Sequence, residues 1–152
     1  MRIEAATEAE IGKPLSEVFA FVDDNGKLPQ WLSLCASLQQ KTPGPKTTGT
    51  ELHYEYKAGG GTRGMDGKVV EYVNDQKLAM RFEGRMFDVQ VSFGFRATGS
   101  STVMRHEMSI EPKSFMARLM SPLIRSQTRK QLVKDTEKLK QILERGQAGA
   151  PR

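Results

Sequence analysis

His106 is the residue of this sequence with the clearest capacity for chemistry. It lies in an alternating segment, residues 102–111, and shares one face of that segment with Met104, Met108 and Ile110. Such alternation is typical of a β-strand with one buried side. A neutral imidazole on that side could orient a ligand carbonyl or act as a general base. The sequence favours the simpler interpretation, a core histidine that hydrogen-bonds to a neighbour.

Aromatic residues could form the wall of a cavity that His106 faces. The candidates are Trp31, Tyr54, Tyr56 and Phe93. Each tyrosine hydroxyl would be available to the polar end of a ligand. In a protein without a cavity, the same rings would simply be core. The other histidine, His53, alternates to the opposite face from the two tyrosines, so we expect it to be exposed and inert.

Methionine is unusually frequent, with eight in 152 residues. The methionines that fall on faces expected to point inward are Met80, Met104, Met108, Met116 and Met120. Because methionine fills irregular space and adapts its shape, this pattern slightly favours a deformable lipophilic pocket over a tightly packed core. Charges that could stand at the mouth of such a pocket are Arg63, Asp66, Arg81 and Arg85, although a paired surface arginine is the simpler interpretation of Arg81.

The sequence carries no motif for a metal, a nucleotide or a catalytic nucleophile. It has one cysteine, Cys35, and two histidines that are expected on opposite faces of the strands. The glycines at 59–61 and 64 lie between two expected strands, where no helix N-terminus follows to hold a phosphate. A hairpin turn explains them better. We therefore expect no cofactor, no metal and no nucleic-acid partner.

The order of expected elements is one strand, two short helices, about six strands and one long helix. The first strand covers Arg2–Ile11, and helical spacing follows at 15–22 and 28–32. Alternating segments joined by short turns then run from Ala36 to Glu111, which indicates an antiparallel meander. The sequence thus predicts an α+β fold in a single domain, residues 1–145. We expect a disordered tail at 146–152, which is rich in Gly, Ala and Pro.

The terminal helical run, Lys113–Arg145, is the stretch around which the strands are expected to be organised. Its apolar stripe turns polar at Gln127, Thr128 and Gln131, where a cavity could lie. Pro122 interrupts the run and predicts either a kink or two helices, the second capped by Ser121. Both alternatives remain open from the sequence. The side chains expected to cover the sheet are Phe115, Leu119, Leu123, Leu132, Leu139 and Leu143.

Charge is concentrated in this same run. The chain has a net charge of +5, and residues 113–145 hold nine Lys or Arg against three Asp or Glu. A solvated outer face is the ordinary explanation, while weak contact with an anionic membrane surface is the alternative. No apolar stretch approaches the roughly 20 residues that span a bilayer, and the N-terminus does not resemble a targeting peptide. We expect a cytoplasmic protein, monomeric or homodimeric.

Three segments in order resemble the START-like superfamily, also called SRPBCC. They are the opening "I.A...I.KP.SEVFAFV.D" at Ile3–Asp23, "LPQW" at Leu28–Trp31 and "TEKLKQILE" at Thr136–Glu144. The resemblance covers most of the chain and is to polyketide cyclase/dehydrase-type and coenzyme-Q-binding members. It implies the helix-grip fold, in which a bent antiparallel sheet of about seven strands holds the terminal helix and leaves a cavity between them.

The resemblance also implies a hydrophobic or aromatic small-molecule ligand, such as a lipid, a polyketide or a quinone-like molecule, sometimes with chemistry. We expect a cavity of a few hundred Å³. The residues expected to contact the ligand are Trp31, Tyr54, Tyr56, Met80, Phe93, His106, Met120, Thr128 and Gln131. A polyketide cyclase/dehydrase-type enzyme and a membrane-apposed lipid or quinone carrier are the alternative functions.

Overall fold

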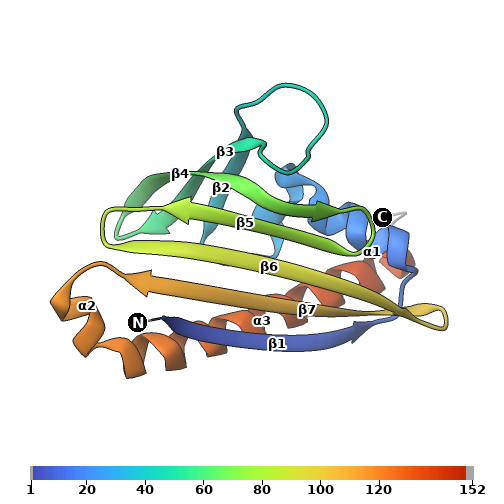
Figure 1. Ribbon diagram of the computed structural model, residues 1–152. Coiled ribbons are helices and arrows are strands. Elements are labelled where there is room, and N and C mark those ends of the chain that lie inside the picture. Colours follow the sequence, from blue (N-terminus) through green and yellow to red (C-terminus); the bar gives the residue numbers. More distant parts are fainter. Residues whose placement is uncertain (1, 150–152) are drawn as a thin grey trace.

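Seven antiparallel strands form one sheet in the order β1-β7-β6-β5-β4-β3-β2 (Figure 1). The computed structural model describes residues 2–149. The elements are β1 (Ile3–Ile11), α1 (Leu15–Asp23), the 3-10 helix η1 (Asn25–Gln30), β2 (Cys35–Gln40), β3 (Glu51–Ala58), β4 (Gly61–Val73), β5 (Lys77–Glu83), β6 (Phe87–Thr98), β7 (Ser101–Pro112), α2 (Phe115–Leu119) and α3 (Ser121–Gly149). The predicted α+β class, the meander and the long terminal helix are confirmed.

The sheet bends because its strand pairing is interrupted at particular residues. Register shifts occur between Cys35 and Ser37 in β2, and between Val69 and Glu71 in β4. Extra residues of this kind increase local twist and curvature. Gly67, also in β4, approaches β5 so closely that an added Cβ would lie 2.1 Å from the Arg81 carbonyl oxygen. The curved sheet therefore depends on glycine at this position.

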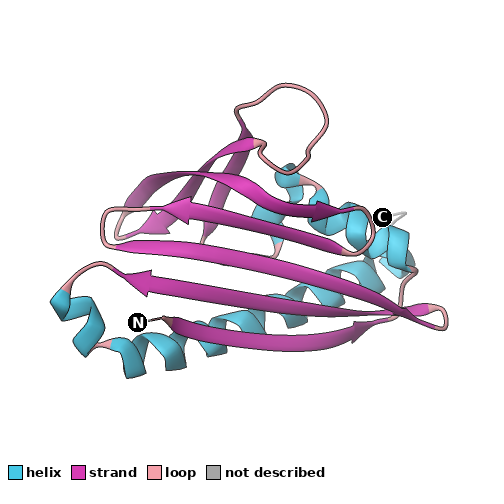
Figure 2. Cartoon of the chain, viewed as in Figure 1, coloured by secondary structure: helices cyan, strands magenta, loops and turns pink. Residues whose placement is uncertain are grey.

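The second half of α3 covers the inner face of this sheet (Figure 2). Leu132, Leu139 and Leu143 are buried, as the sequence predicted, and α3 packs mainly against β1. Its C-terminal part is also joined to the sheet by polar contacts. The Gly12 N–H donates to Glu144 Oε2 at 2.7 Å, and Lys140 Nζ donates to the Glu10 carbonyl at 2.6 Å.

The terminal helical run is split into two helices at Met120. Ser114 caps α2 by accepting a hydrogen bond from the Ala117 N–H at 3.1 Å, and α3 begins at Ser121 with Pro122 in its first turn, where proline is tolerated. The structure thus selects two helices over a kink. Within α3, residues 146–149 are helical, and the disorder expected for the tail stays a prediction. Residues 150–152 of that tail lie outside the described residues.

The first part of the run does not cover the sheet, and this corrects two predictions. Phe115, Leu119 and Leu123, expected to face the sheet, are exposed, and so are Met116 and Met120, expected to point inward. The reason is geometric: α2 is only five residues long, it follows the end of β7 and it buries only Ala117. A helix placed beyond the sheet has no apolar partner, whatever its spacing.

Candidate functional site

A cavity of about 320 Å³ lies between the inner face of the sheet and α3. Its lining residues are Leu28, Leu32, Leu34, Leu38, Tyr54, Tyr56, Arg63, Met65, Met80, Phe82, Gly84, Arg85, Met86, Phe87, Val89, Val91, His106, Met108, Ile110, Thr128, Gln131, Leu132 and Asp135. Most of these side chains are apolar. The predicted void of a few hundred Å³, which falls in the range of small-ligand sites, is confirmed.

The two tyrosines of β3 form one aromatic part of the cavity wall. Alternation along the strand places both on the inner face, where their rings stack with centroids 5.9 Å apart. Tyr54 also packs against Phe82 of β5, with centroids 5.2 Å apart. Burial is the main cause that raises the pKa of the Tyr54 hydroxyl well above its usual range. This hydroxyl therefore stays protonated at neutral pH and can donate a hydrogen bond.

His106 is fully buried and yet keeps one nitrogen available. Its Nδ1 hydrogen-bonds to Thr136 Oγ1 on α3 at 3.1 Å. Phe93 and Trp31 pack around the ring, with centroids 4.8 and 5.8 Å from it. Burial lowers the pKa of His106 to about 3, so the imidazole is neutral. Among the described residues, Nε2 has no hydrogen-bond partner. His106 is thus a bonded core histidine that also lines the cavity.

Asp135 is a second buried polar group in the wall, and the sequence reasoning missed it. Asp135 is only 2% exposed. Burial raises the pKa of its carboxyl, although hydrogen bonds from Ser33 and Gln131 act to lower that pKa. Its Oδ2 has no hydrogen-bond partner within the part of the chain that the structure describes. One signal could have found it: Asp135 follows Gln131 by four residues, on the polar part of the helical stripe.

Two arginines stand at the exposed part of the cavity wall. Arg63 and Arg85 line the cavity and are exposed, and neither has an ion-pair partner among residues 2–149. Arg81 does not line it and instead pairs with Asp88 at 3.2 Å. Asp66 is also outside, on the opposite face of β4. Of the four charged residues considered for the mouth of the cavity, only Arg63 and Arg85 therefore line it.

The expected ligand-binding residues fall into three groups in the structure. Those that line the cavity are Tyr54, Tyr56, Met80, His106, Thr128 and Gln131. Trp31 and Phe93 do not line it but pack behind His106. Met120 lies away from it and is exposed, since α2 ends there. Contact of any of these residues with a ligand stays a prediction.

His53 lies outside the cavity, as predicted, in an acidic cluster on the outer face. It hydrogen-bonds to Asp66 and to Glu55. Those two bonds, that to Asp66 foremost, raise the pKa of His53 above its ordinary value. The other reactive side chain, Cys35 at the start of β2, is fully buried beside Tyr56. Burial is the main cause that raises the pKa of its thiol to about 11.

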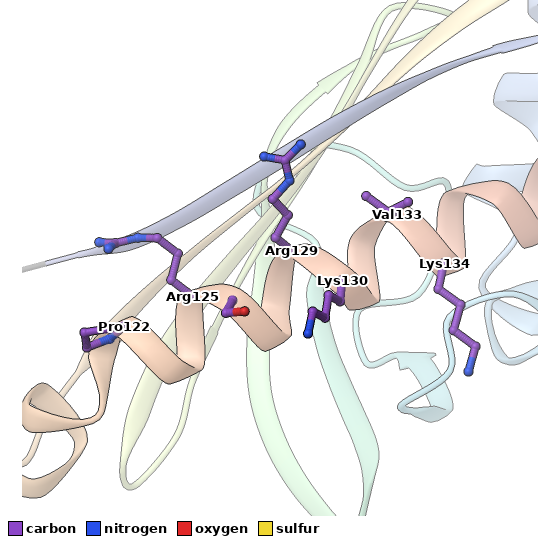
Figure 3. Close-up of a pocket in the computed structure, with 7 residues that line it drawn as sticks. Pro122, Arg125, Arg129, Lys130, Val133 and Lys134 are labelled. Carbon is purple, nitrogen blue, oxygen red and sulfur yellow. The ribbon is translucent and has the colours of Figure 1, made fainter.

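The outer face of α3 carries the basic side chains, as the sequence indicated. Figure 3 shows them along a shallow, open depression that runs from Pro122 to Lys134. Arg125 and Arg129 extend from one side of the helix, and Lys130 and Lys134 from another. All four are exposed. This depression belongs to the surface of the helix and is separate from the cavity under it.

A bent antiparallel sheet that holds a long C-terminal helix over an apolar cavity defines a helix-grip protein of the START/SRPBCC type. The family described as "Polyketide cyclase / dehydrase and lipid transport" matches residues 2–144. The chain belongs to this family, and the predicted superfamily is confirmed.

Solved structures share this fold at low sequence identity. A START superfamily protein from Mycobacterium smegmatis is 14% identical, with 93% of this chain and 97% of that chain covered and a TM-score of 0.76. A protein from Thermus thermophilus is 16% identical, with 91% and 94% covered and a TM-score of 0.74. The di-domain ARO/CYC StfQ from the steffimycin biosynthetic pathway is 10% identical, with 98% and 52% covered and a TM-score of 0.77.

These likenesses concern the fold alone, because the identities are so low. A comparison with curated proteins gives no match. Within residues 2–149, no helix combines the length and the apolar character needed to cross a membrane. The expectation of no cofactor and no metal stays a prediction.

Proposed function

We propose that this protein binds an apolar small molecule that carries one uncharged polar group, held between the sheet and α3. The observation that supports this proposal is the cavity of about 320 Å³, whose apolar wall contains two buried polar atoms without partners among the described residues, His106 Nε2 and Asp135 Oδ2. A buried polar atom that forms no hydrogen bond costs about 1–3 kcal/mol. A ligand that bonds to either atom removes part of that cost.

The chemistry of these two atoms selects the polar group of the ligand. The neutral His106 imidazole offers a donor or an acceptor, according to its tautomer. Asp135 accepts when ionised and also donates when protonated, which its raised pKa favours. A hydroxyl can bond to either group, and a carbonyl can accept a hydrogen bond from either group when that group carries the proton. An anionic group beside Asp135 would meet repulsion and a second desolvation cost.

A matched pair of ligands tests this proposal. Isothermal titration calorimetry compares 1-naphthol with naphthalene, which lacks the hydroxyl. We expect 1-naphthol to bind more tightly to the native protein, and this preference to shrink in His106→Phe. The control is His53→Gln, because His53 lies on the outer face. No binding of either compound, or an equal preference in His106→Phe, would contradict the proposal.

Blocking the cavity gives an independent check. Val89 lines the cavity and is only partly buried, so Val89→Trp should fill the void with little damage to the sheet. We expect this variant to lose 1-naphthol binding while circular dichroism shows an unchanged fold. Native mass spectrometry of the unmodified protein should also detect a co-purifying apolar molecule that is absent from Val89→Trp.

A second candidate function is dehydration of a β-hydroxy ketone, and the presence of His106 and Asp135 in the wall of one cavity favours it. A neutral imidazole can take a proton α to a carbonyl, and a protonated carboxyl can give its proton to the departing hydroxyl, which leaves as water. The C–H and C–O bonds break as the C=C bond forms, so no oxidant or reductant is needed. This mechanism concerns the same cavity.

Absorbance of a conjugated enone measures this activity. With 4-hydroxy-4-phenylbutan-2-one as substrate, we expect the native protein to produce benzalacetone faster than His106→Phe or Asp135→Asn. His53→Gln should match the native rate. Equal rates in all four proteins would exclude this candidate and leave ligand binding as the proposed function.

A further inference from the structure

Five large apolar side chains are exposed on α2 and the start of α3. Phe115, Met116, Leu119, Met120 and Leu123 are 46% to 70% exposed, and we call them the apolar patch. They lie within nine residues, on a short helix and the helical turn after it. Isolated exposed apolar residues are ordinary, but a contiguous group of this kind marks an interaction surface.

The apolar patch adjoins the rim of the cavity. Lys113, two residues before α2, donates its backbone N–H to the Met86 carbonyl and its Nζ to the Gly84 carbonyl, both at 2.8 Å. Gly84, Arg85 and Met86 line the cavity, and Met86 is itself exposed. Figure 1 shows α2 at the same end of the sheet as the turn between β5 and β6.

The surroundings of the patch are positively charged. Residues 113–134 contain no Asp or Glu. Of their six cations, Lys113 pairs with Asp88 at 2.8 Å. The other five have no ion-pair partner among the described residues: Arg118, Arg125, Arg129, Lys130 and Lys134. Figure 3 shows four of these side chains, Arg125, Arg129, Lys130 and Lys134, extending from α3, and all four are exposed. At the rim, Arg85 adds a further charge that is exposed and has no ion-pair partner among the described residues.

We propose that the apolar patch docks this protein on an anionic lipid bilayer, with the rim of the cavity facing the membrane. Side chains that project from a short helix can insert among acyl chains, while the surrounding cations are attracted to anionic headgroups. Docking in this orientation would let an apolar ligand pass between bilayer and cavity without crossing water. That last role rests on the proposed ligand-binding function, whereas docking itself does not.

Charge favours a membrane over a second copy of the chain. A two-fold dimer places the same surface of each subunit face to face. Here it would bring two cation-rich surfaces together, with no acid at 113–134 to balance them. An anionic bilayer supplies both the apolar layer and the opposite charge.

Co-sedimentation with vesicles tests the docking. We expect the full chain to bind vesicles of phosphatidylcholine mixed with phosphatidylglycerol, to bind pure phosphatidylcholine much less, and to lose binding as salt rises. Phe115→Asp should weaken vesicle binding at least about tenfold, the loss expected when one large apolar side chain no longer enters the lipid. Aspartate is well tolerated in the first turn of a helix, so the fold should persist.

The matched control is Val73→Asp, which makes the same kind of change at an exposed apolar residue at the end of β4. It should bind vesicles like the native protein. Arg118→Gln should reduce the salt dependence, and its control Arg96→Gln, on β6, should not.

The same variant separates docking from ligand binding. Phe115→Asp should keep the 1-naphthol affinity of the native protein, because Phe115 does not line the cavity. Loss of 1-naphthol binding in Val89→Trp with intact vesicle binding would show that the two properties are separate. Docking is overturned if native protein does not bind the anionic vesicles, or if Phe115→Asp and Val73→Asp bind them equally. A native dimer that Phe115→Asp dissociates, without vesicle binding, would identify the patch as a subunit interface instead.

Discussion

The two ends of the terminal helical run use the same kinds of side chain in opposite ways. Near its start, the apolar patch is exposed; near its end, Leu132, Leu139 and Leu143 are buried. Both ends carry large apolar residues at helical spacing. They differ in what lies opposite, since α3 faces β1 and β7 whereas α2 has passed the end of the sheet. Periodicity shows which side of a helix is apolar, and the position of the helix decides whether that side is buried.

Removing the whole run should have the largest effect. Without residues 112–152, the inner face of the sheet loses its cover, including the leucines of α3, and becomes a large exposed apolar surface. We expect the remaining fragment to aggregate or to melt without cooperativity, as circular dichroism would show. A soluble, cooperatively folding fragment of residues 1–111 would refute the helix-grip architecture as the basis of stability.

Single leucine substitutions should separate the two ends. Leu139 is fully buried, so Leu139→Ala should lower the free energy of unfolding by roughly 2–5 kcal/mol. Leu119→Ala, in the exposed patch, should change it by less than about 0.5 kcal/mol. Urea denaturation measures both values. Similar losses in the two variants would mean that the patch is buried in solution.

Buried His106 should make stability depend on pH. Its pKa falls from 6.5 in the unfolded chain to about 3 in the native one, so between these values the unfolded state binds the extra proton. Stability should therefore fall as pH drops through this window, by up to about 1.4 kcal/mol per pH unit. Urea denaturation across the window should show a weaker slope in His106→Gln than in the native protein.

His53 should respond in the opposite direction. Its hydrogen bonds to Asp66 and Glu55 raise its pKa above 6.5, so its contribution is complete below that pH and is lost as the pH rises through the native value. Nuclear magnetic resonance titration should find His53 protonating above pH 6.5 and His106 remaining neutral there. Two histidines that titrate together would contradict the assigned burial.

The polar part of α3 should show the smallest effect on stability. Thr128 and Gln131 line the cavity and are only partly buried, so alanine at either position should change the free energy of unfolding by less than about 1 kcal/mol. The affinity for 1-naphthol should change instead, as calorimetry would detect. A large loss of stability with unchanged affinity would assign these residues to the core.

The strands were predictable because alternation alone determines which side chains share a face. The inward placement of Tyr54, Met80 and His106 follows from that rule. Alternation does not determine whether an inward side chain lines the cavity or lies behind the lining. It therefore could not distinguish Phe93, which packs behind His106, from the residues on the cavity surface.

Tertiary placement accounts for the remaining differences. The exposure of α2 depends on where β7 ends relative to the helix, and no local pattern encodes this. Asp135 was missed because an acid on a helix is usually solvated, and only the opposing sheet makes this one buried. The split into two helices at Met120 was one of two alternatives that local preference alone could not separate.

Cys35 provides the chain with its own reporter of internal motion. The thiol is completely enclosed and, with a pKa near 11, almost entirely protonated at neutral pH. Reaction with a thiol reagent therefore requires the structure around the start of β2 to open, and its rate measures how often this local opening occurs. Since no other cysteine competes, the labelling kinetics of the unmodified protein can follow opening events directly. A molecule that binds in the cavity should slow the labelling of Cys35.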